Sequence, residues 1–257
     1  MHNEKFAPDL CRKSRGNNFL YDTVESTNSS AREIFLSGEG GHGTLVAANC
    51  QTNGRGRLGR EFYSPQDTGI YMSVILEPCE TISPVTMITS AAAVAVCDAI
   101  VELAPTLDPR IKWVNDILIG GKKVCGILAE GIIPPGCRRP VAIIVGIGIN
   151  CQTSVFPSEI ADIAGSLGAA VSRSALCARV CDRLLEICES IDDGTMIESY
   201  RARSAVLGKS VRCFGEGRET IYGKVVSICD DSALLIEEDD GKITQISSGE
   251  ISLRLDE

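Results

Sequence analysis

Histidine is almost absent from this sequence of 257 residues, which has only two, His2 and His42. A catalytic triad built on histidine and a metal centre with several histidine ligands therefore both lack their usual residues. The sequence also has no G-x-x-x-x-G-K-S/T phosphate loop. Its GIGIN segment at 146–150 lacks the third glycine of the dinucleotide-binding fingerprint. We therefore expect any catalysis to depend on charged side chains and the backbone.

Long apolar segments and paired cysteine motifs are missing as well. We find no run of about 18 apolar residues, the length that can cross a bilayer. Residues 1–19 also lack the continuous apolar stretch of a signal peptide. The twelve cysteines include no C-x-x-C pair, which favours reduced structural thiols over disulfides or a metal site. These features predict a cytoplasmic protein with no membrane partner.

Acidic residues outnumber basic ones, with 34 Asp and Glu against 25 Lys and Arg, which gives a net charge of −9 and a pI of about 4.9. An excess of negative charge opposes binding to a polyanion, so we expect no nucleic-acid partner unless a local basic patch exists. Hydrophobic residues make up 44% of the chain. That share is enough for the core of one large domain with a small companion.

The pattern of apolar residues predicts an α+β fold. We expect strands at 19–24, 44–50, 69–78, 110–114, 116–133 (as a hairpin) and 140–150, and helices at 26–38, 83–104, 172–191 and 195–204. The hairpin is indicated by Gly120 and Gly121 between two apolar runs. Because hairpins alternate with inserted helices, the sheet should be mixed, with helices packed on it.

Beyond Gly208 the sequence pattern changes to short segments in which apolar and polar residues alternate, and these predict the closely spaced strands of a small β barrel. The predicted organisation is a leader at 1–18, a catalytic domain at 19–207 and a C-terminal barrel domain at 208–257.

A loop rich in arginine and glycine, 54–60, holds three residues of each kind in a chain that is acidic overall. Glycines let a ligand approach the backbone, and guanidinium groups form paired hydrogen bonds with carboxylate or phosphate oxygens. The pattern therefore suits an anionic ligand. Taken alone, it is equally compatible with a solvated turn or a nonspecific RNA contact.

Two further segments place lysines near polar groups. The IKWVND segment, 111–116, sets Lys112, the single tryptophan and an Asn-Asp pair side by side. Taken alone, an ordinary strand end with a turn is the simpler interpretation. Lys122 and Lys123 then begin one arm of the predicted hairpin, where alternation directs them to opposite faces. One of the two can therefore face a pocket.

Six motifs taken in order resemble the biotin protein ligase family: ESTN (25–28), QTNGRGRLGR (51–60), KWVND (112–116), KKVCGIL (122–128), GIGIN (146–150) and GEISLR (249–254). The resemblance extends from about residue 19 to residue 254. It implies a ligase that uses ATP and Mg²⁺ to activate biotin as biotinyl-5′-AMP. The ligase would then transfer biotin to a lysine of a biotin carboxyl carrier domain. It also implies an SH3-like C-terminal barrel, and a homodimer is compatible with it.

The resemblance also implies roles for particular residues. The biotin-binding set comprises Ser26, Thr27, Asn28, Gln51, Arg55, Gly56, Arg57, Lys123, Gly126, Leu128, Gly146 and Gly148. The ATP-binding set comprises Arg57, Arg60, Phe62, Lys112, Asn115, Asp116 and Asn150. Lys123, Arg55 and Arg57 are the implied catalytic residues, and no protein metal site is implied.

The chain departs from the family pattern at two positions, and two alternatives stay open. Val114 stands where a proline is usual, and Phe62 stands where relatives often have tryptophan. Lipoate ligation shares the fold and the adenylation chemistry, and a nucleic-acid-binding module is a second, weaker alternative. Eighteen residues precede the first expected strand, too few for a helix-turn-helix domain with its own core. We therefore expect a ligase without repressor activity.

Overall fold

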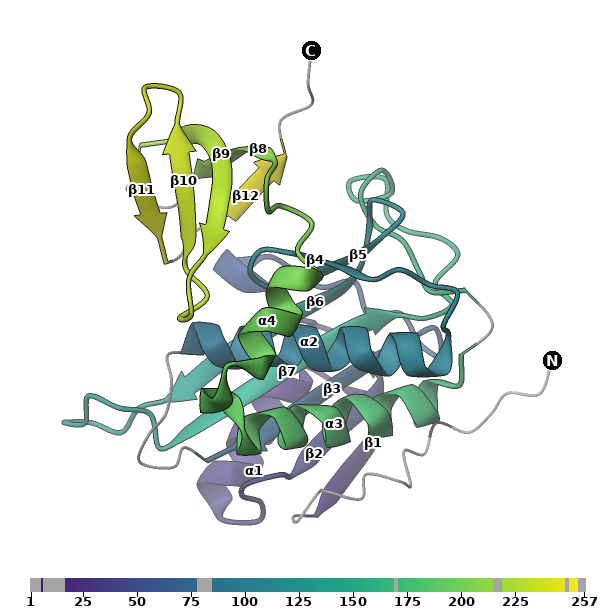
Figure 1. The fold of residues 1–257 in the computed structure, drawn as a ribbon. Coiled ribbons are helices and arrows are strands. Elements are labelled where there is room, and N and C mark those ends of the chain that lie inside the picture. Colours follow the sequence, from purple (N-terminus) through teal and green to yellow (C-terminus); the bar gives the residue numbers. More distant parts are fainter. Residues whose placement is uncertain are drawn as a thin grey trace.

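A seven-stranded mixed sheet forms the larger part of the fold (Figure 1). The computed structural model describes residue 6 and residues 17–77, 85–168, 171–214, 219–247 and 250–253. The strands are β1 (Asn18–Val24), β2 (Leu45–Gln51), β3 (Gly69–Leu76), β4 (Arg110–Lys112), β5 (Asp116–Ile119), β6 (Lys122–Ile132) and β7 (Ala142–Asn150). Their order is β1-β2-β3-β7-β6-β5-β4, and only the β1–β2 pair is parallel. The predicted α+β class is confirmed.

Helices α2 (Val85–Leu103), α3 (Arg173–Glu189) and α4 (Thr195–Ala202) form the layer on one face of this sheet (Figure 1). Alternate residues of β7 point into this layer and are buried: Ile143, Val145, Ile147 and Ile149. The expectation that no segment is long and apolar enough to cross a membrane is wrong for α2. That helix passes by length and composition, but 67% of its apolar window is buried inside the molecule. We therefore describe it as the core helix of this layer.

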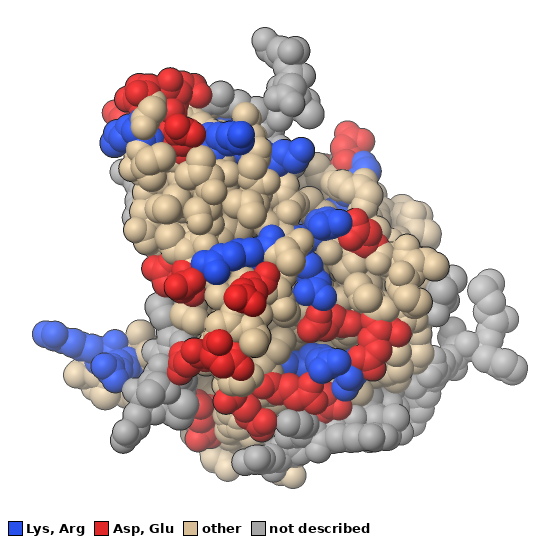
Figure 2. All heavy atoms as spheres, in the orientation of Figure 1, with Lys and Arg blue, Asp and Glu red and all other residues tan. Residues whose placement is uncertain are grey.

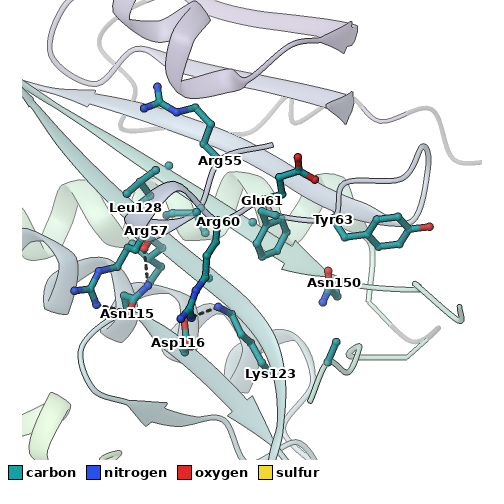
Figure 3. Close-up of a pocket in the computed structure, with 18 of the residues that line it drawn as sticks. Arg55, Arg57, Arg60, Glu61, Tyr63, Asn115, Asp116, Lys123, Leu128 and Asn150 are labelled. Carbon is teal, nitrogen blue, oxygen red and sulfur yellow. Dashed lines mark hydrogen bonds and ion pairs between the residues drawn. The ribbon is translucent and has the colours of Figure 1, made fainter. Parts of the chain in front are cut away.

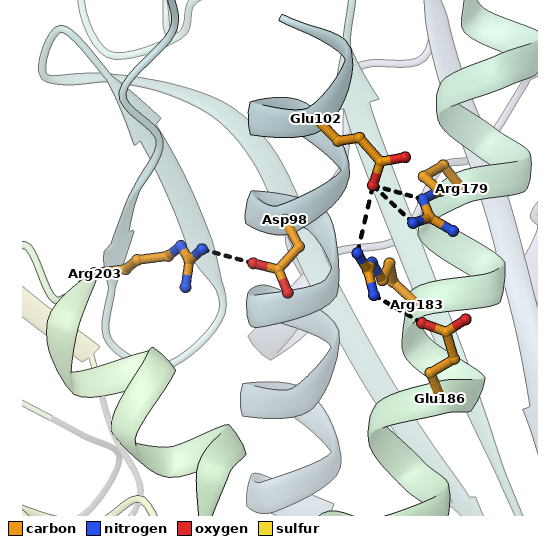
Figure 4. Close-up of polar contacts among 6 residues, drawn as sticks. All are labelled: Asp98, Glu102, Arg179, Arg183, Glu186 and Arg203. Carbon is orange, nitrogen blue, oxygen red and sulfur yellow. Dashed lines mark hydrogen bonds and ion pairs between the residues drawn. The ribbon is translucent and has the colours of Figure 1, made fainter. Parts of the chain in front are cut away.

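Ion pairs on the outer side of this layer connect the helices (Figure 4). Glu102 of α2 accepts hydrogen bonds from Arg179 and Arg183 of α3, at 2.8 and 3.5 Å. Asp98 of α2 is paired with Arg203, just after α4, at 2.6 Å. Figure 2 shows acidic and basic side chains gathered over this helical face. The charges therefore bridge neighbouring helices above an apolar interior.

Helix α1 (Thr27–Ser37) covers part of the opposite face. It ends at Gly38, whose φ of 76° is the left-handed conformation that favours glycine at a helix C-terminus. The buried residues between α1 and the sheet are Ala31, Ile34, Val46, Ile75, Ile132, Ala142 and Ile144. Further along β7, the residues on this face are Gly146 and Gly148. Small residues there leave the rest of the face open.

The C-terminal region forms a second, antiparallel sheet of five strands, β8 (Ser210–Phe214), β9 (Ile221–Ile228), β10 (Leu234–Glu238), β11 (Ile243–Ile246) and β12 (Glu250–Leu253). Its order is β11-β10-β9-β8-β12. Hydrogen bonds connect it to the larger sheet region. The Trp113 indole donates to the Ser232 carbonyl at 2.8 Å, and Arg201 of α4 donates to the Ile228 carbonyl at 2.7 Å. Gly249 and Arg254, the first and last residues of the GEISLR motif, lie outside the described residues.

The cysteines within the described ranges form no disulfide bonds. Cys97, Cys125, Cys151, Cys177, Cys181 and Cys213 are buried. Burial raises the pKa of Cys97 and of Cys151 to about 12, because a thiolate would lose its hydration. These side chains therefore act as small apolar core residues.

Candidate active site

A cavity of about 390 Å³ lies on the open face of the larger sheet (Figure 3). Every residue implied by the sequence motifs lines it: Ser26, Thr27, Asn28, Gln51, Arg55, Gly56, Arg57, Arg60, Phe62, Lys112, Asn115, Asp116, Lys123, Gly126, Leu128, Gly146, Gly148 and Asn150. These residues come from α1, from five strands and from the loops between them. Segments far apart in the sequence therefore meet in one place.

Glycines form the floor of the cavity. Gly126 of β6 is opposite Gly148 of β7, and Leu128 is opposite Gly146. A Cβ atom added to Gly146 would lie 2.2 Å from Asn28 Oδ1, and one added to Gly148 would lie 2.5 Å from the Phe62 ring. Neither distance is compatible with a side chain unless the neighbour moves. Glycine is therefore required here by the close approach of side chains from α1 and from the loop above the sheet.

A network of uncharged polar groups occupies the α1 end of the cavity. The Thr27 backbone N–H and hydroxyl both donate to Gln51 Oε1, at 2.8 and 3.2 Å. The buried hydroxyl of Ser73 lies 2.8 Å from Thr27 Oγ1 and 2.7 Å from Asn28 Oδ1. Gln51 Nε2 in turn donates to Ser64 Oγ at 2.9 Å. These contacts fix amide and hydroxyl groups, and the residues that make them are all uncharged.

The arginine- and glycine-rich loop is folded back on itself above this floor. Arg55 and Glu61 form an isolated antiparallel bridge, and the Gly56 N–H donates to the Arg60 carbonyl at 2.7 Å. Between them lies a short 3₁₀ turn, Arg57–Gly59, in which Leu58 has a φ of 54°. The loop therefore has a defined shape in this structure.

Two side chains connect this loop to the sheet. Arg55 Nη2 lies 2.9 Å from Glu130 Oε1 of β6, and Asn28 donates to the other carboxylate oxygen of Glu130 at 2.7 Å. Arg57 Nη1 donates to Asn115 Oδ1 at 3.0 Å (Figure 3). Glu130 thus connects the loop to the polar network. No sequence motif singled out Glu130, Ser73 or Ser64, because their partners are distant in sequence.

Lys123 points into the cavity, and Lys122 does not line it. Lys123 Nζ lies 2.7 Å from Asp116 Oδ1 (Figure 3). The Lys122 ammonium donates to the Asp162 carbonyl at the surface. The opposite directions expected from strand alternation are therefore present at this pair. Lys112 also lines the cavity, while Asn115 Nδ2 donates to the Ile127 carbonyl at 2.9 Å.

The far end of the cavity is formed by a segment that no motif predicted. It contributes Phe156, Ile160, Ile163 and Ala164, and Phe214 and Ile251 of the second sheet complete the lining. Asn150 donates to the Gly165 carbonyl at 3.0 Å, while its Oδ1 atom is buried without a hydrogen-bond partner among the described residues. That oxygen can accept a hydrogen bond from a ligand.

The arrangement suits a ligand pair whose reacting ends are both anionic. Five cations, Arg55, Arg57, Arg60, Lys112 and Lys123, line the cavity together with two carboxylates, Glu61 and Asp116. Arg57, Arg60 and Lys123 lie together near Asn115 and Asp116, whereas the Arg55 guanidinium points away from them (Figure 3) and pairs with Glu130. Cations fixed beside one another can hold two anions together and stabilise the charge that develops when they react. Within the described ranges, no group of three or more His, Cys, Asp or Glu residues is placed to hold a metal ion.

Comparisons with known proteins agree with this geometry. A model of the biotin/lipoate A/B protein ligase family matches residues 20–150, and a model of the biotin protein ligase C terminal domain matches residues 206–254. The bifunctional ligase/repressor BirA of Bacillus spizizenii is 37% identical over 93% of this chain and 74% of its own length. The biotin acetyl-CoA-carboxylase ligase of Mycobacterium tuberculosis is 30% identical over 90% of this chain and 87% of its own.

A solved structure is similar as well. Biotin protein ligase from Aquifex aeolicus, in complex with biotin and ATP, has a TM-score of 0.78 and 31% identity. The match covers 93% of this chain and 98% of that one.

Proposed function

The chain belongs to the biotin/lipoate A/B protein ligase family, and on this premise we propose that it is an ATP-dependent biotin protein ligase. It joins biotin to AMP with release of pyrophosphate, and then transfers the biotinyl group to a lysine of an acceptor protein. The supporting observation is one cavity that joins an uncharged polar end to a cluster of cations over a glycine floor.

The polar end is suited to the ureido ring of biotin. Its hydroxyl and amide groups, on Ser26, Thr27, Asn28 and Gln51, can pair with a cyclic urea without bringing a charge into the apolar pocket. The glycine floor, with Leu128 beside it, leaves room for the rings. The biotin carboxylate would then extend toward Arg55, Arg57 and Lys123.

The cations allow one anion to attack another. In the first step a carboxylate oxygen of biotin bonds to the α-phosphorus of ATP, and the bond to pyrophosphate breaks. Lys123 and Arg57 would stabilise the charge on the reacting oxygens, while Lys112 and Arg60 hold the phosphates. In the second step the unprotonated amine of the acceptor lysine attacks the mixed anhydride carbonyl, and AMP leaves.

The adenine ring is assigned to the far end of the cavity. Asn150 is held by the Gly165 carbonyl, and its free Oδ1 can accept from an adenine amine. Phe62 provides an aromatic ring in the middle of the pocket, 6.5 Å from Tyr71 between ring centroids. That ring can pack on the ligand, although it lacks the indole N–H of tryptophan.

Mg²⁺ fits this donor set only together with the nucleotide. Mg²⁺ in ATP-dependent enzymes usually binds through one or two carboxylates plus substrate phosphates. Asp116, with Asn115 beside it, is the group in this cavity that would hold it. When bound, the ion would neutralise phosphate charge.

The acceptor is proposed to be a biotin carboxyl carrier protein or domain. Lipoate is the less favoured substrate, because the C-terminal match is to a domain described as that of biotin protein ligases.

The proposal is tested by incubating the full chain with ATP, Mg²⁺ and either biotin or lipoate. We expect pyrophosphate release with biotin only, and mass spectrometry should find retained biotinyl-5′-AMP. Pyrophosphate release with lipoate and not biotin would contradict the proposal, as would ATP hydrolysis that needs neither acid. A carrier domain whose acceptor lysine is changed to arginine provides the control for the transfer step.

A further inference from the structure

We propose that Lys122, which does not line the cavity, is a positioning residue for ATP binding. It acts through the segment that forms the far wall of the cavity, Phe156–Gly165. The inference rests on the proposed function, in which this end of the cavity binds the adenine portion of ATP.

The Lys122 side chain contacts this segment directly. Its ammonium group donates to the backbone carbonyl of Asp162. That carbonyl lies at the end of a short turn in which the Ile160 N–H donates to the Pro157 carbonyl at 3.0 Å and the Ala164 N–H donates to the Ile160 carbonyl at 2.8 Å. A cation at the carbonyl end of such a turn stabilises it by a charge-assisted hydrogen bond.

The backbone of the next residue fixes the same segment to β6. The Lys123 N–H donates to the Ile163 carbonyl at 2.7 Å, and the Gly165 N–H donates to the Lys123 carbonyl at 2.8 Å. Together they form a parallel bridge between Lys123 and Ala164. The Lys122 side chain and the Lys123 backbone therefore hold three residues of the wall by hydrogen bonds, Asp162, Ile163 and Gly165.

The other end of the segment orients Asn150. The Gly165 carbonyl accepts from Asn150 Nδ2 at 3.0 Å, and the Leu167 N–H donates to the Asn150 carbonyl at 2.9 Å. With Nδ2 occupied, the buried Oδ1 is the side-chain atom left to meet a ligand. Displacing the segment from β6 would therefore turn this amide as well as move Ile160 and Ile163.

Apolar packing contributes little to holding the segment. Ile163 is 61% exposed, and Phe156 is only half-buried, with its ring 6.3 Å from that of Tyr63 between centroids, so the polar contacts with β6 are the main restraint. Gly165 must also pass close to β6, because a Cβ atom there would lie 2.7 Å from Lys122 Cβ. Gly165 is not among the residues with positive φ. Alanine at this position would therefore act by steric contact rather than by backbone strain.

The test compares ATP and biotin binding in Lys122→Met, Lys122→Arg and Gly165→Ala, with Lys224→Met as a control at an exposed lysine of β9. Dissociation constants for ATP and for biotin are measured separately by calorimetry, and steady-state kinetics give kcat and both KM values. Loss of one charge-assisted hydrogen bond predicts about a tenfold weaker ATP affinity in Lys122→Met. We expect biotin affinity and kcat within about twofold of wild type, because the lost hydrogen bond supports only the end of the cavity that binds ATP.

The two additional variants distinguish positioning from general damage. Lys122→Arg keeps a donor and should retain most of the ATP affinity, whereas Gly165→Ala should weaken ATP binding and spare biotin binding. Unchanged ATP affinity in Lys122→Met would overturn the inference, and so would equal losses for ATP and biotin. A wild-type chain that binds ATP but forms no biotinyl-5′-AMP would contradict the proposed function alone, because the ATP affinities of the variants would still be compared.

Discussion

The two faces of the larger sheet are formed by the same strands but differ in what they contribute. On β7, the face toward α2 and α3 has Ile143, Val145, Ile147 and Ile149, all buried against helices. The face toward the cavity has Ala142 and Ile144 under α1, and then Gly146, Gly148 and Asn150. Because side chains alternate along a strand, one segment of nine residues supplies both a core and a binding floor. Substitutions one residue apart should therefore separate stability from activity.

Ile143→Ala should have the largest effect, and that effect should be on stability. Ile143 is 1% exposed under the helical layer, and removing a large aliphatic side chain from a core costs about 2–5 kcal/mol of unfolding free energy. Urea denaturation measures the loss. The KM values of the folded fraction should stay at those of wild type. A change in KM without a change in stability would contradict the assignment of Ile143 to the core face of β7.

Lys123→Met should have the largest effect on activity. It removes the ammonium group proposed to lie beside the reacting oxygens and keeps most of the apolar stem. Removing one such stabilising group lowers kcat by about 10²–10³. Pyrophosphate release in a single turnover measures the rate. Because Asp116 would lose its partner, the double variant Lys123→Met with Asp116→Asn is the control, and recovery of activity in it would contradict the assignment.

Gly148→Ala tests the cavity face of β7 and should weaken ligand binding. The added methyl would lie 2.5 Å from Phe62, and overpacking of this kind costs about 1–3 kcal/mol, so affinity for biotin and ATP should fall about tenfold. Gly131→Ala on β6 is the matched control, since its Cβ would meet Pro140 at 3.2 Å and Ile133 at 3.9 Å, and neither residue lines the cavity. Equal losses in both variants would show that the effect comes from the sheet and not from the cavity.

Glu102→Gln on the outer surface should have the smallest effect. A hydrogen bond from Arg179 lowers the pKa of Glu102, so the carboxylate stabilises the fold above the pKa it has in the unfolded chain. This contribution is lost as the pH falls through the lower, folded-state pKa. The side chain is 43% exposed, so solvent screening limits the contribution to a few tenths of a kcal/mol.

Urea midpoints of wild type and Glu102→Gln at pH 7 and at low pH would measure the contribution of the Glu102 carboxylate to stability. The variant should be slightly less stable than wild type at pH 7, and the difference should vanish once Glu102 is protonated. A deficit that grows on acidification would contradict the assigned sign. The activity of Glu102→Gln should equal that of wild type.

The sequence predicted the fold well where the signal is local. Gly120 and Gly121 both adopt positive φ in the hairpin, as a two-residue turn between strands requires. Alternation also separated Lys122 from Lys123. The cavity residues within compact motifs were found because glycines, arginines and an Asn-Asp pair occur close together in the sequence.

The rest of the site depends on contacts that no local pattern encodes. Glu130 and Ser73 have ordinary strand positions, and they matter only because Asn28 lies against both of them. The wall at Phe156–Gly165 has no regular element, so its bridge to Lys123 could not be read from periodicity. The helix at α2 was predicted, but its high mean hydropathy was missed, because Thr89, Ser90 and Asp98 interrupt the run of apolar residues.

Trp113, whose indole donates a hydrogen bond to the Ser232 carbonyl, is an intrinsic fluorescence probe of the junction between the two sheets. The chain has a single tryptophan, so all indole fluorescence arises at the junction between the two sheets, in a side chain that is only 3% exposed and lines the cavity. Its emission should be blue-shifted in the native state. Separation of the C-terminal sheet would shift the emission maximum to longer wavelength. A ligand entering the cavity would change the emission intensity and leave the emission maximum unchanged. Wavelength and intensity would thus report two different motions from one label that needs no engineering.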